Sequence, residues 1–403
     1  MQILYLHQYF NTPQMSGGTR SYEMARRLVS AGHEVHMITS DRDHSAKGDW
    51  RVTHEAGIVV HWLSVPYSNR MPYRKRIEAF LWFAFKSGMR SACLPADVIF
   101  ATSTPLTIVL PAFYAARCQR KPMVFEVRDL WPELPIAVRA IRNPVLIAMA
   151  KQLERFAYNN SKAVVALSPG MKEGVVRTGY PRERVHVIPN SCDLELFQAP
   201  ANSGISFRKK FPWLDDRPLV IYAGTFGRIN GVGYLAKLAA ETMKLASGVR
   251  FLAVGDGAEF ELVKNLARDL GVLEKNFFMM SSLPKADMPV LFSAATISTS
   301  FFIDLPQMWS NSANKFFDSL AAGRPVAINH EGWQANLLRE SGAGLVLPVK
   351  DFPEAARLLV SSITDKAWIA KAVKAAQSLA YNRFARDRLA EQLEMILTQA
   401  AQK

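Results

Sequence analysis

Short apolar runs alternate with longer helical patterns along most of this chain, and that alternation limits the possible folds more than any other feature. The strands predicted in the first half are 2–6, 34–39, 58–65, 97–101, 123–127, 163–167 and 185–188. The helical patterns between them are 19–31, 105–118, 143–160 and 169–178. Strands that alternate with helices in this way indicate a parallel sheet covered by helices.

The alternation pauses once, between residues 189 and 216, where turn-forming residues replace the periodic pattern. A second series of strands follows at 218–223, 249–254, 276–280, 295–299, 325–329 and 344–347. A chain of 403 residues is also longer than one core usually supports. We therefore predict an α/β fold of two doubly wound, Rossmann-like domains that face each other across a cleft.

The predicted boundaries follow from the same pattern. Residues 1–188 form the N-terminal domain, 189–216 the linker and 217–380 the C-terminal domain. The last stretch, 381–403, reads as one amphipathic helix, for which we consider a return to the N-terminal domain. In such folds ligands bind outside the carboxyl ends of the strands.

Composition limits the classes of partner and the cellular compartment that we expect. The formal net charge of +14 favours nucleic acid, an anionic membrane or a phosphorylated ligand. Three scattered cysteines fit a reducing compartment, and neither a signal peptide nor an apolar run long enough to cross a bilayer is seen, so we expect a cytoplasmic protein. Residues 70–92 mix arginine and lysine with aromatic side chains, which is typical either of a helix on an anionic membrane or of a core helix with a basic entry.

Three glycine turns follow predicted strands. Gly17 and Gly18 precede the first helix, Gly227 and Arg228 lie in the loop after 218–223, and Gly255 follows 249–254. Backbone N–H groups at such turns can hold an anion, and an arginine there can form a bidentate contact with a diphosphate. The structural alternative is a loop that needs only a positive φ angle, with a solvated arginine.

The segment "SNSANKFFDSLAAGRPVAIN", residues 310–329, places polar side chains at the start of an otherwise apolar helix. Lys315 lies in the first turn, where the helix dipole disfavours a cation unless an anion binds there. Asp318 lies one turn further, at the distance from a diphosphate that a ribose would occupy. The alternative is an exposed i,i+3 ion pair, worth only a few tenths of a kcal/mol.

This helix is also one of several segments that resemble a known family. "NKFFDSLAAGRPV", "AGTFGRINGVGYL", "MSGGTRSYEMARRLVSAGHEVHMITS", "EVRDLWPE" and "VIPNSCDLELF" are similar, in this order, to family-4 glycosyltransferases of the GT-B fold. The resemblance covers nearly the whole chain. Within the family it points to L-fucosamine transferases of bacterial O-antigen and capsule clusters.

The resemblance implies retaining transfer of a sugar, such as N-acetyl-L-fucosamine, from a nucleotide diphosphate, with UDP as the expected nucleotide. It implies no cofactor and no metal. The family's second glutamate is matched by Asp318, which should hold the ribose, whereas the first falls on Ser310. Arg228 matches the first cation of the diphosphate site, the second falls on Asn230, and Lys315 is the expected replacement. The complete predicted donor site is Gly17, Gly18, Gly227, Arg228, Asn230, Gly255, Asn314, Lys315 and Asp318.

Catalysis is then expected to be electrostatic, with Arg228 and Lys315 stabilising the departing diphosphate. Asp129 or Glu133 is the candidate base if transfer inverts the sugar. The predicted acceptor-binding residues are Arg20, Arg128, Asp129 and Glu133. The structural alternative for "RDLWPE" is that its tryptophan and proline pack while Asp129 caps a turn.

The expected acceptor is a lipid-linked glycan, met at the inner face of the cytoplasmic membrane through residues 70–92. Two other functions were weighed. A nucleotide-sugar epimerase of the same fold would share the nucleotide site but need no basic surface for an acceptor. A nucleic-acid-binding protein is the third, but the basic residues form no known nucleic-acid module, so we expect no nucleic acid.

Overall fold

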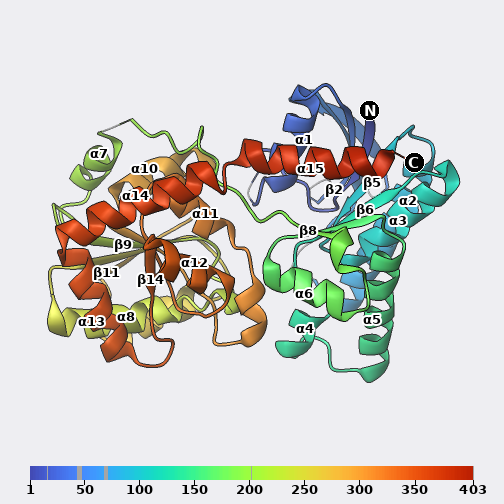
Figure 1. Cartoon of the computed structure of the whole chain (residues 1–403). Coiled ribbons are helices and arrows are strands. Elements are labelled where there is room, and N and C mark those ends of the chain that lie inside the picture. Colours follow the sequence, from blue (N-terminus) through green and yellow to red (C-terminus); the bar gives the residue numbers. More distant parts are fainter. Residues whose placement is uncertain (16, 43–47, 68–70, 201, 403) are drawn as a thin grey trace. The chain divides into compact units, whose positions relative to one another are not determined.

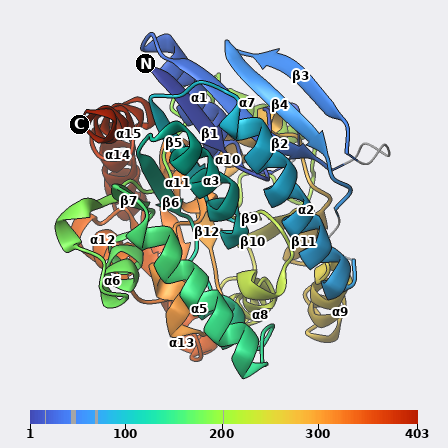
Figure 2. The same cartoon turned by 90° about the vertical axis from the view of Figure 1, so that its right-hand side faces the viewer.

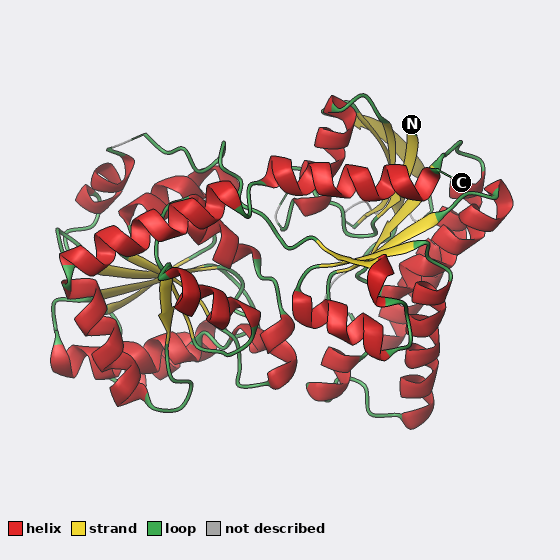
Figure 3. Cartoon of the chain, viewed as in Figure 1, coloured by secondary structure: helices red, strands yellow, loops and turns green. Residues whose placement is uncertain are grey.

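The computed structural model of the chain describes residues 1–402 apart from 16, 43–47, 68–70 and 201, and it divides into two compact units (Figure 1). Unit 1 comprises Met1–Pro189 together with Asp387–Lys403, and unit 2 comprises Asn190–Arg386. Helices cover both faces of the sheet in each unit, as Figure 3 shows. Each unit is therefore an α/β sandwich of the doubly wound kind.

The sheet of unit 1 has the order β3-β4-β2-β1-β5-β6-β7-β8, and all neighbours are parallel except β3 and β4. Its strands are β1 (Gln2–Leu6), β2 (Glu34–Asp41), β3 (Trp50–Glu55), β4 (Ile58–Ser64), β5 (Val98–Thr102), β6 (Met123–Val127), β7 (Ala163–Ala166) and β8 (Val185–Val187). The seven predicted strands lie within a residue or two of these bounds. The edge strand β3 was not predicted, because its side chains are largely exposed and mostly polar.

The helices of unit 1 are α1 (Arg20–Ser30), α2 (Tyr73–Ala92), α3 (Val109–Gln119), α4 (Glu133–Ala137), α5 (Pro144–Asn159), α6 (Pro169–Arg177) and the greater part of α15 (Arg386–Ala401). Figure 2 shows α2, α3 and α5 together on one side of the sheet. Phe113 of α3 and Phe156 of α5 meet edge to face, with ring centroids 4.8 Å apart. These helices cover one of the two apolar cores of the unit.

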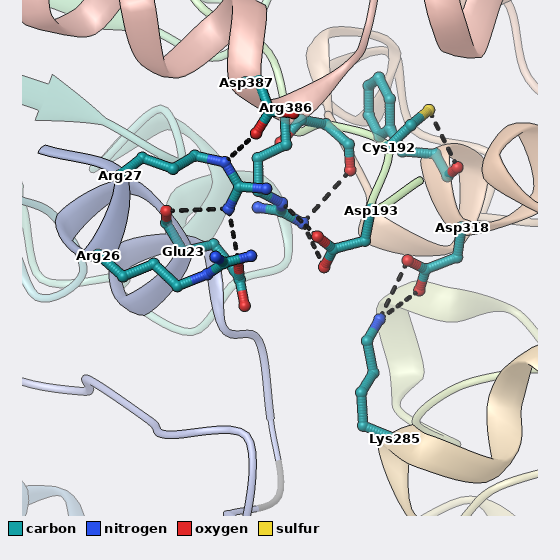
Figure 4. Close-up of polar contacts among 11 residues, drawn as sticks. Glu23, Arg26, Arg27, Cys192, Asp193, Lys285, Asp318, Arg386 and Asp387 are labelled. Atoms are coloured by element: carbon teal, nitrogen blue, oxygen red, sulfur yellow. Dashed lines mark hydrogen bonds and ion pairs between the residues drawn. The ribbon is translucent and has the colours of Figure 1, made fainter. Parts of the chain in front are cut away.

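Helix α15 closes the other core, together with α1. Leu389, Leu393, Ile396, Leu397 and Ala400 are buried there, at the spacing of one helical face. Ion pairs support this packing: Arg27 of α1 contacts both Glu23 and Asp387 (Figure 4). The end of the chain thus belongs physically to unit 1.

The sheet of unit 2 is wholly parallel, in the order β11-β10-β9-β12-β13-β14. Its strands are β9 (Leu219–Ala223), β10 (Arg250–Val254), β11 (Phe277–Met280), β12 (Ile297–Ser300), β13 (Val326–Ile328) and β14 (Gly344–Val346). All six were predicted, with small differences at the ends. Their near-continuous apolar sequences follow from burial on both faces.

The helices of unit 2 are α7 (Ser203–Lys209), α8 (Gly233–Leu245), α9 (Phe260–Asp269), α10 (Met288–Ala294), α11 (Asn314–Ala321), α12 (Trp333–Ser341), α13 (Phe352–Thr364) and α14 (Lys366–Asn382). The predicted linker 189–216 is wrong for most of its length. Phe197, Phe207 and Leu214 are buried in a core of unit 2, and Phe207 lies on α7. The C-terminal helix predicted for 381–403 corresponds to α15, but it begins at Arg386, because α14 extends to Asn382.

Candidate functional site

The sheet of unit 2 has a topological switch point between β9 and β12. From β9 the chain builds outward through β10 and β11 on one side, and later through β12, β13 and β14 on the other. Loops on the two sides therefore leave the carboxyl edge in opposite directions at this point, which is where open α/β sheets bind ligands. The loop after β9 and the start of α11 both lie at this edge.

Glycines let the loops after β9 and β10 pack directly against each other. A Cβ atom on Gly255 would lie 1.8 Å from the carbonyl oxygen of Gly224, and one on Gly257 would lie 2.5 Å from that of Phe226. Gly255 is buried and its N–H donates to the carbonyl of Met280 at 3.0 Å. Gly255 therefore has a packing role in this structure, and its donor contact stays a prediction.

The loop that begins at Gly227 is held from inside. The side-chain amide of Asn230 donates to the carbonyl of Thr225 at 2.9 Å, and the Tyr222 hydroxyl donates to the same oxygen at 2.8 Å. Further along the loop, the carbonyl of Ile229 accepts from the N–H of Ile303, after β12, at 3.1 Å. The loop is thus fixed on both sides of the switch point.

Lys315 reaches into this loop from the first turn of α11. Its Nζ donates to Asn230 Oδ1 at 2.8 Å and lies 4.8 Å and 5.4 Å from the ring centroids of Tyr222 and Phe302. Burial lowers the pKa of its ammonium group to about 7, although the residue as a whole is only partly buried. The structure therefore brings Lys315 into contact with Asn230. Asn230 is the residue on which the second cation of the diphosphate site falls, and Lys315 is the residue expected to supply that cation instead.

Arg228 opens the short 3₁₀ turn Arg228–Asn230, in the same loop as Asn230, and its side chain is exposed. Within the part of the chain that the structure describes, its guanidinium has no hydrogen-bond or ion-pair partner. Asn314, the first residue of α11, is also exposed, and none of the described side chains caps this helix end. An anion at the start of α11 would meet unpaired backbone N–H groups and two cationic side chains.

Asp318 is engaged in an ion pair that the sequence did not reveal. Its two carboxylate oxygens accept from Lys285 Nζ at 3.0 and 3.1 Å (Figure 4). Lys285 lies in the 3₁₀ turn Lys285–Asp287, before α10, and nothing in the local pattern there indicates a site. The predicted pair of Lys315 and Asp318 does not form, since each has another partner.

His330 is a second residue that the sequence reasoning missed. It follows β13, its ring centroid lies 5.0 Å from that of Phe302, and its Nδ1 is 2.9 Å from the carbonyl oxygen of Glu331. Nδ1 must therefore carry the proton, which leaves Nε2 as an acceptor without a described partner. Burial first, and the nearby charge of Lys315, lower the pKa of His330 to about 4. Its position directly after a strand was the signal that could have found it.

Ser310, which takes the place of the family's first glutamate, ends the 3₁₀ turn Pro306–Ser310 and is half-buried. Trp309 in the same turn lies against Gly332, whose Cβ would be 2.4 Å from the Trp309 carbonyl oxygen. The Trp333 indole donates to the carbonyl of Asn311 at 2.9 Å. The segment before α11 is thus braced by the start of α12.

Gly17 and Gly18 lie in unit 1, before α1, and not in the cluster described above. Gly17 has φ +127°, a conformation that favours glycine, and a Cβ there would displace the end of the Asn11 side chain, 2.7 Å away. Arg20 is 2% exposed, and its guanidinium donates to Glu126 and to the carbonyls of Ile188 and Pro189. This placement gives Arg20 a structural role, in place of the predicted acceptor contact.

The other predicted acceptor residues lie around the switch point of unit 1, between β1 and β5. Arg128 follows β6, and its guanidinium donates to His7 Nε2 at 3.3 Å, while its N–H donates to Ser103 Oγ at 3.0 Å. Burial, with the charge of Arg128, lowers the pKa of His7 well below its usual value. The imidazole is therefore neutral at pH 7 and presents a lone pair to Arg128.

Asp129 is partly buried, and this burial raises the pKa of its carboxyl group despite the neighbouring Arg128. Its Oδ2 accepts from Thr104 Oγ1 at 3.3 Å. Glu133 is exposed at the start of α4 and lies 3.5 Å from Arg177. Arg128 and Asp129 thus lie at the same edge of the sheet, whereas Glu133 faces solvent.

Among the described residues, no group of three or more histidine, cysteine, aspartate or glutamate side chains is placed to hold a metal ion. Within the same residues, every helix is too short or too polar to span a lipid bilayer.

A cavity of about 250 Å³ lies elsewhere in unit 2, along the edge strand β11, and is lined by aromatic residues that include Trp213 and Phe278.

Comparison with known proteins gives matches for both halves of the chain. Residues 17–191 match the family described as "Glycosyl transferase 4-like domain", and residues 217–365 match "Glycosyl transferases group 1". Alpha-D-kanosaminyltransferase of Streptomyces kanamyceticus is 24% identical over 52% of this chain, and the match spans only about half (53%) of that protein. The putative colanic acid biosynthesis glycosyl transferase WcaI of Escherichia coli K12 is 24% identical over 67% of this chain and 70% of its own length.

Among solved structures, HepE of Anabaena in complex with UDP matches the fold with a TM-score of 0.73 at 17% identity. That match covers 99% of this chain and 100% of HepE. The fold predicted from the sequence, two Rossmann-like α/β domains, is confirmed. The two family matches together span most of the chain, and the chain belongs to the family-4 glycosyltransferases of the GT-B fold.

Proposed function

We propose that the chain is a retaining glycosyltransferase that moves a sugar from a nucleotide diphosphate to a lipid-linked glycan in the synthesis of a bacterial surface polysaccharide. The observation that carries this proposal is the contact of Lys315 with Asn230, beside Arg228, whose guanidinium has no partner among the described residues. Arg228, Lys315 and the N-terminus of α11 together place two cations and unpaired N–H groups at the switch point of unit 2, where a diphosphate could bind. HepE, which has the same fold, binds UDP, and UDP is the nucleotide we propose here.

In the proposed reaction, the bond between the sugar C1 and the β-phosphate oxygen breaks while an acceptor oxygen bonds to C1 from the same face. The acceptor proton passes to the departing phosphate, so no enzymic base is required. Arg228 and Lys315 stabilise the negative charge that collects on the leaving group, and the loss of one such group typically costs about a hundredfold in rate. Asp318 would accept hydrogen bonds from the ribose hydroxyls.

The acceptor is assigned to unit 1, where Arg128 and Asp129 lie at the carboxyl edge of the sheet. N-acetyl-L-fucosamine is the sugar proposed from the resemblance. WcaI, named for colanic acid biosynthesis, supports a role in polysaccharide synthesis. The family matches favour transfer over epimerisation, and no observation favours nucleic-acid binding.

Membrane contact is proposed for one face of α2, within the predicted segment 70–92, of which residue 70 lies outside the described residues. Ile77, Leu81, Phe85 and Met89 repeat every four residues and are 37%, 52%, 63% and 56% exposed. Such a continuous apolar stripe is unusual on a surface that meets only water. Leu110 and Tyr114 of α3 are exposed as well, and α3 packs closely on α2.

The basic and aromatic residues predicted for this contact divide into two groups. Arg74 and Lys75 are exposed at the start of α2, whereas Arg76 donates to the Tyr67 hydroxyl at 3.1 Å. Phe83 is fully buried in the core of unit 1, so it cannot contact lipid. The proposed membrane face is therefore apolar along its length and cationic at one end.

The proposal is tested by incubating the protein with a panel of nucleotide sugars, with and without lipid-linked acceptors, and following products by mass spectrometry. Transfer to a lipid-linked acceptor, with the anomeric configuration retained by NMR, is the expected result. Asp318→Ala should weaken nucleotide binding. Turnover without an acceptor product, or an inverted linkage, would contradict the corresponding part of the proposal.

A further inference from the structure

Lys285 and Asp318 come from segments 33 residues apart, and they meet beside the proposed nucleotide site. The contact joins a 3₁₀ turn after β11 to the second turn of α11. Both side chains are largely shielded from water, with 26% of Lys285 and 15% of Asp318 exposed. The pair is therefore less exposed to solvent than an ordinary surface ion pair, which usually contributes little to stability.

The ammonium group of Lys285 is fixed from a second direction. Its Nζ lies 5.5 Å from the ring centroid of Phe197, which is itself buried and packs edge to face on Phe292. A lysine held by an aromatic face and by both oxygens of one carboxylate has little freedom left. Asp318 is accordingly held in one orientation before any ligand arrives.

This geometry leaves capacity for a ligand. An ionised carboxylate has about four acceptor positions, and Lys285 uses one on each oxygen. The remaining positions match the two hydroxyl donors of a ribose. A ribose hydroxyl can also accept a hydrogen bond. The Lys285 ammonium group has three N–H donors, of which two contact Asp318, so the third can donate to a ribose hydroxyl beside the carboxylate.

We propose that Lys285 is a positioning and specificity-determining residue of the ribose subsite, where it orients Asp318 and makes the pair selective for a ribose that carries its 2′-hydroxyl. This inference rests on the proposed function, in which Asp318 holds the ribose. A 2′-deoxyribose would leave one acceptor position of Asp318 and one donor of Lys285 unpaired in a partly buried place. Unpaired polar groups of this kind are the basis of strong discrimination between substrates.

The test compares binding of UDP and 2′-deoxy-UDP by calorimetry. The wild-type protein should bind UDP at least about tenfold more tightly, the discrimination expected from one hydrogen bond to a charged group. Lys285→Met should reduce that ratio to within about threefold, and Lys285→Arg, which keeps the charge and the donors, should restore most of it. Lys374→Met, at an exposed lysine on α14, is the matched control and should leave the ratio unchanged.

The outcomes separate this inference from the proposed function. If Asp318→Ala abolishes the discrimination but Lys285→Met does not, the role of Lys285 is wrong while the ribose assignment stands. Should Asp318→Ala leave the ratio unaltered, the assignment of Asp318 to ribose fails, and the inference fails with it. Equal affinity of the wild-type protein for UDP and 2′-deoxy-UDP also overturns the inference. If UDP, GDP and ADP all fail to bind, both proposals are overturned. Thermal melting of each variant shows whether a lost ratio reflects a lost fold.

Discussion

Nucleotide binding is expected to draw a proton onto Lys315. In the free protein, burial against Tyr222 and Phe302 lowers the pKa of its ammonium group to about 7. A diphosphate at the start of α11 would raise that pKa again, because an anion nearby favours the charged form. Affinity should then fall with rising pH above 7, as the free protein loses the proton that the complex requires.

The size of the effect follows from this pKa. With a value of about 7, roughly a quarter of the Lys315 side chains are charged at pH 7.5 and about one in a hundred at pH 9. Affinity for UDP should therefore drop about 25-fold across this range if the ammonium stays charged in the complex. The neighbours of Lys315 do not titrate there: His330, with its pKa lowered to about 4, stays neutral, and burial raises the pKa of the Tyr222 hydroxyl further above its usual value. Terminal phosphates lose their last proton near pH 6, below the window.

The stability of the free protein should change with pH in the opposite direction to the affinity for UDP. Between pH 7 and the ordinary lysine pKa, the unfolded chain binds more protons at Lys315 than the folded chain does, so this residue should make the free protein more stable as pH rises. Affinity and stability should thus change in opposite directions with pH, which few other groups would produce together.

Calorimetry in two buffers of different ionisation enthalpy measures the proton directly. At pH 8 about 0.9 proton should be taken up for each UDP bound, and Lys315→Met should abolish the uptake. Lys371→Met, at an exposed lysine on α14, is the control and should behave as the wild-type protein does. An affinity that is constant from pH 7.5 to 9, with no proton uptake, would refute the reasoning.

Three other outcomes are expected. Arg228→Ala should lower kcat by about a hundredfold with a smaller change in nucleotide affinity, as measured by steady-state kinetics, because the guanidinium is assigned to the developing charge. Asp193→Ala should destabilise the chain by about 3–5 kcal/mol in urea denaturation, since it leaves Arg386, bound by both Asp193 oxygens at 2.9 and 3.0 Å, charged and buried without a carboxylate to neutralise it (Figure 4). The double variant Leu81→Ser/Phe85→Ser should sediment less with anionic liposomes than the wild-type protein, and equal sedimentation would remove the membrane proposal.

The sequence predicted the strands of both units because most are buried on both faces, so each appears as an apolar run between turn signals. It failed where that relation breaks. β3 is exposed at the edge of its sheet and reads as polar, and the predicted linker contains Phe197 and Phe207, whose burial depends on packing with distant helices. Local patterns carry no information of that kind.

For the candidate site, the same division holds. Lys315, Asn230 and Arg228 could be found because each follows a strand or opens a helix at a turn with a recognisable form. Lys285 could not, since its partner is a helix turn far along the chain and its own surroundings are an ordinary 3₁₀ turn. Arg20 shows the reverse error: a basic residue at a glycine turn resembled a ligand contact, but its charge is neutralised internally by Glu126.

The place of α15 has a consequence for how the chain is made. Leu393 and Leu397 fill the core between α1 and the first strands, yet they emerge from the ribosome after all of unit 2. Unit 2 can therefore acquire its fold before α15 is complete, whereas unit 1 must wait with one hydrophobic face uncovered until α15 has emerged. For expression, a fragment that stops at Pro189 is expected to aggregate, and supplying residues 387–403 as a separate peptide should rescue it.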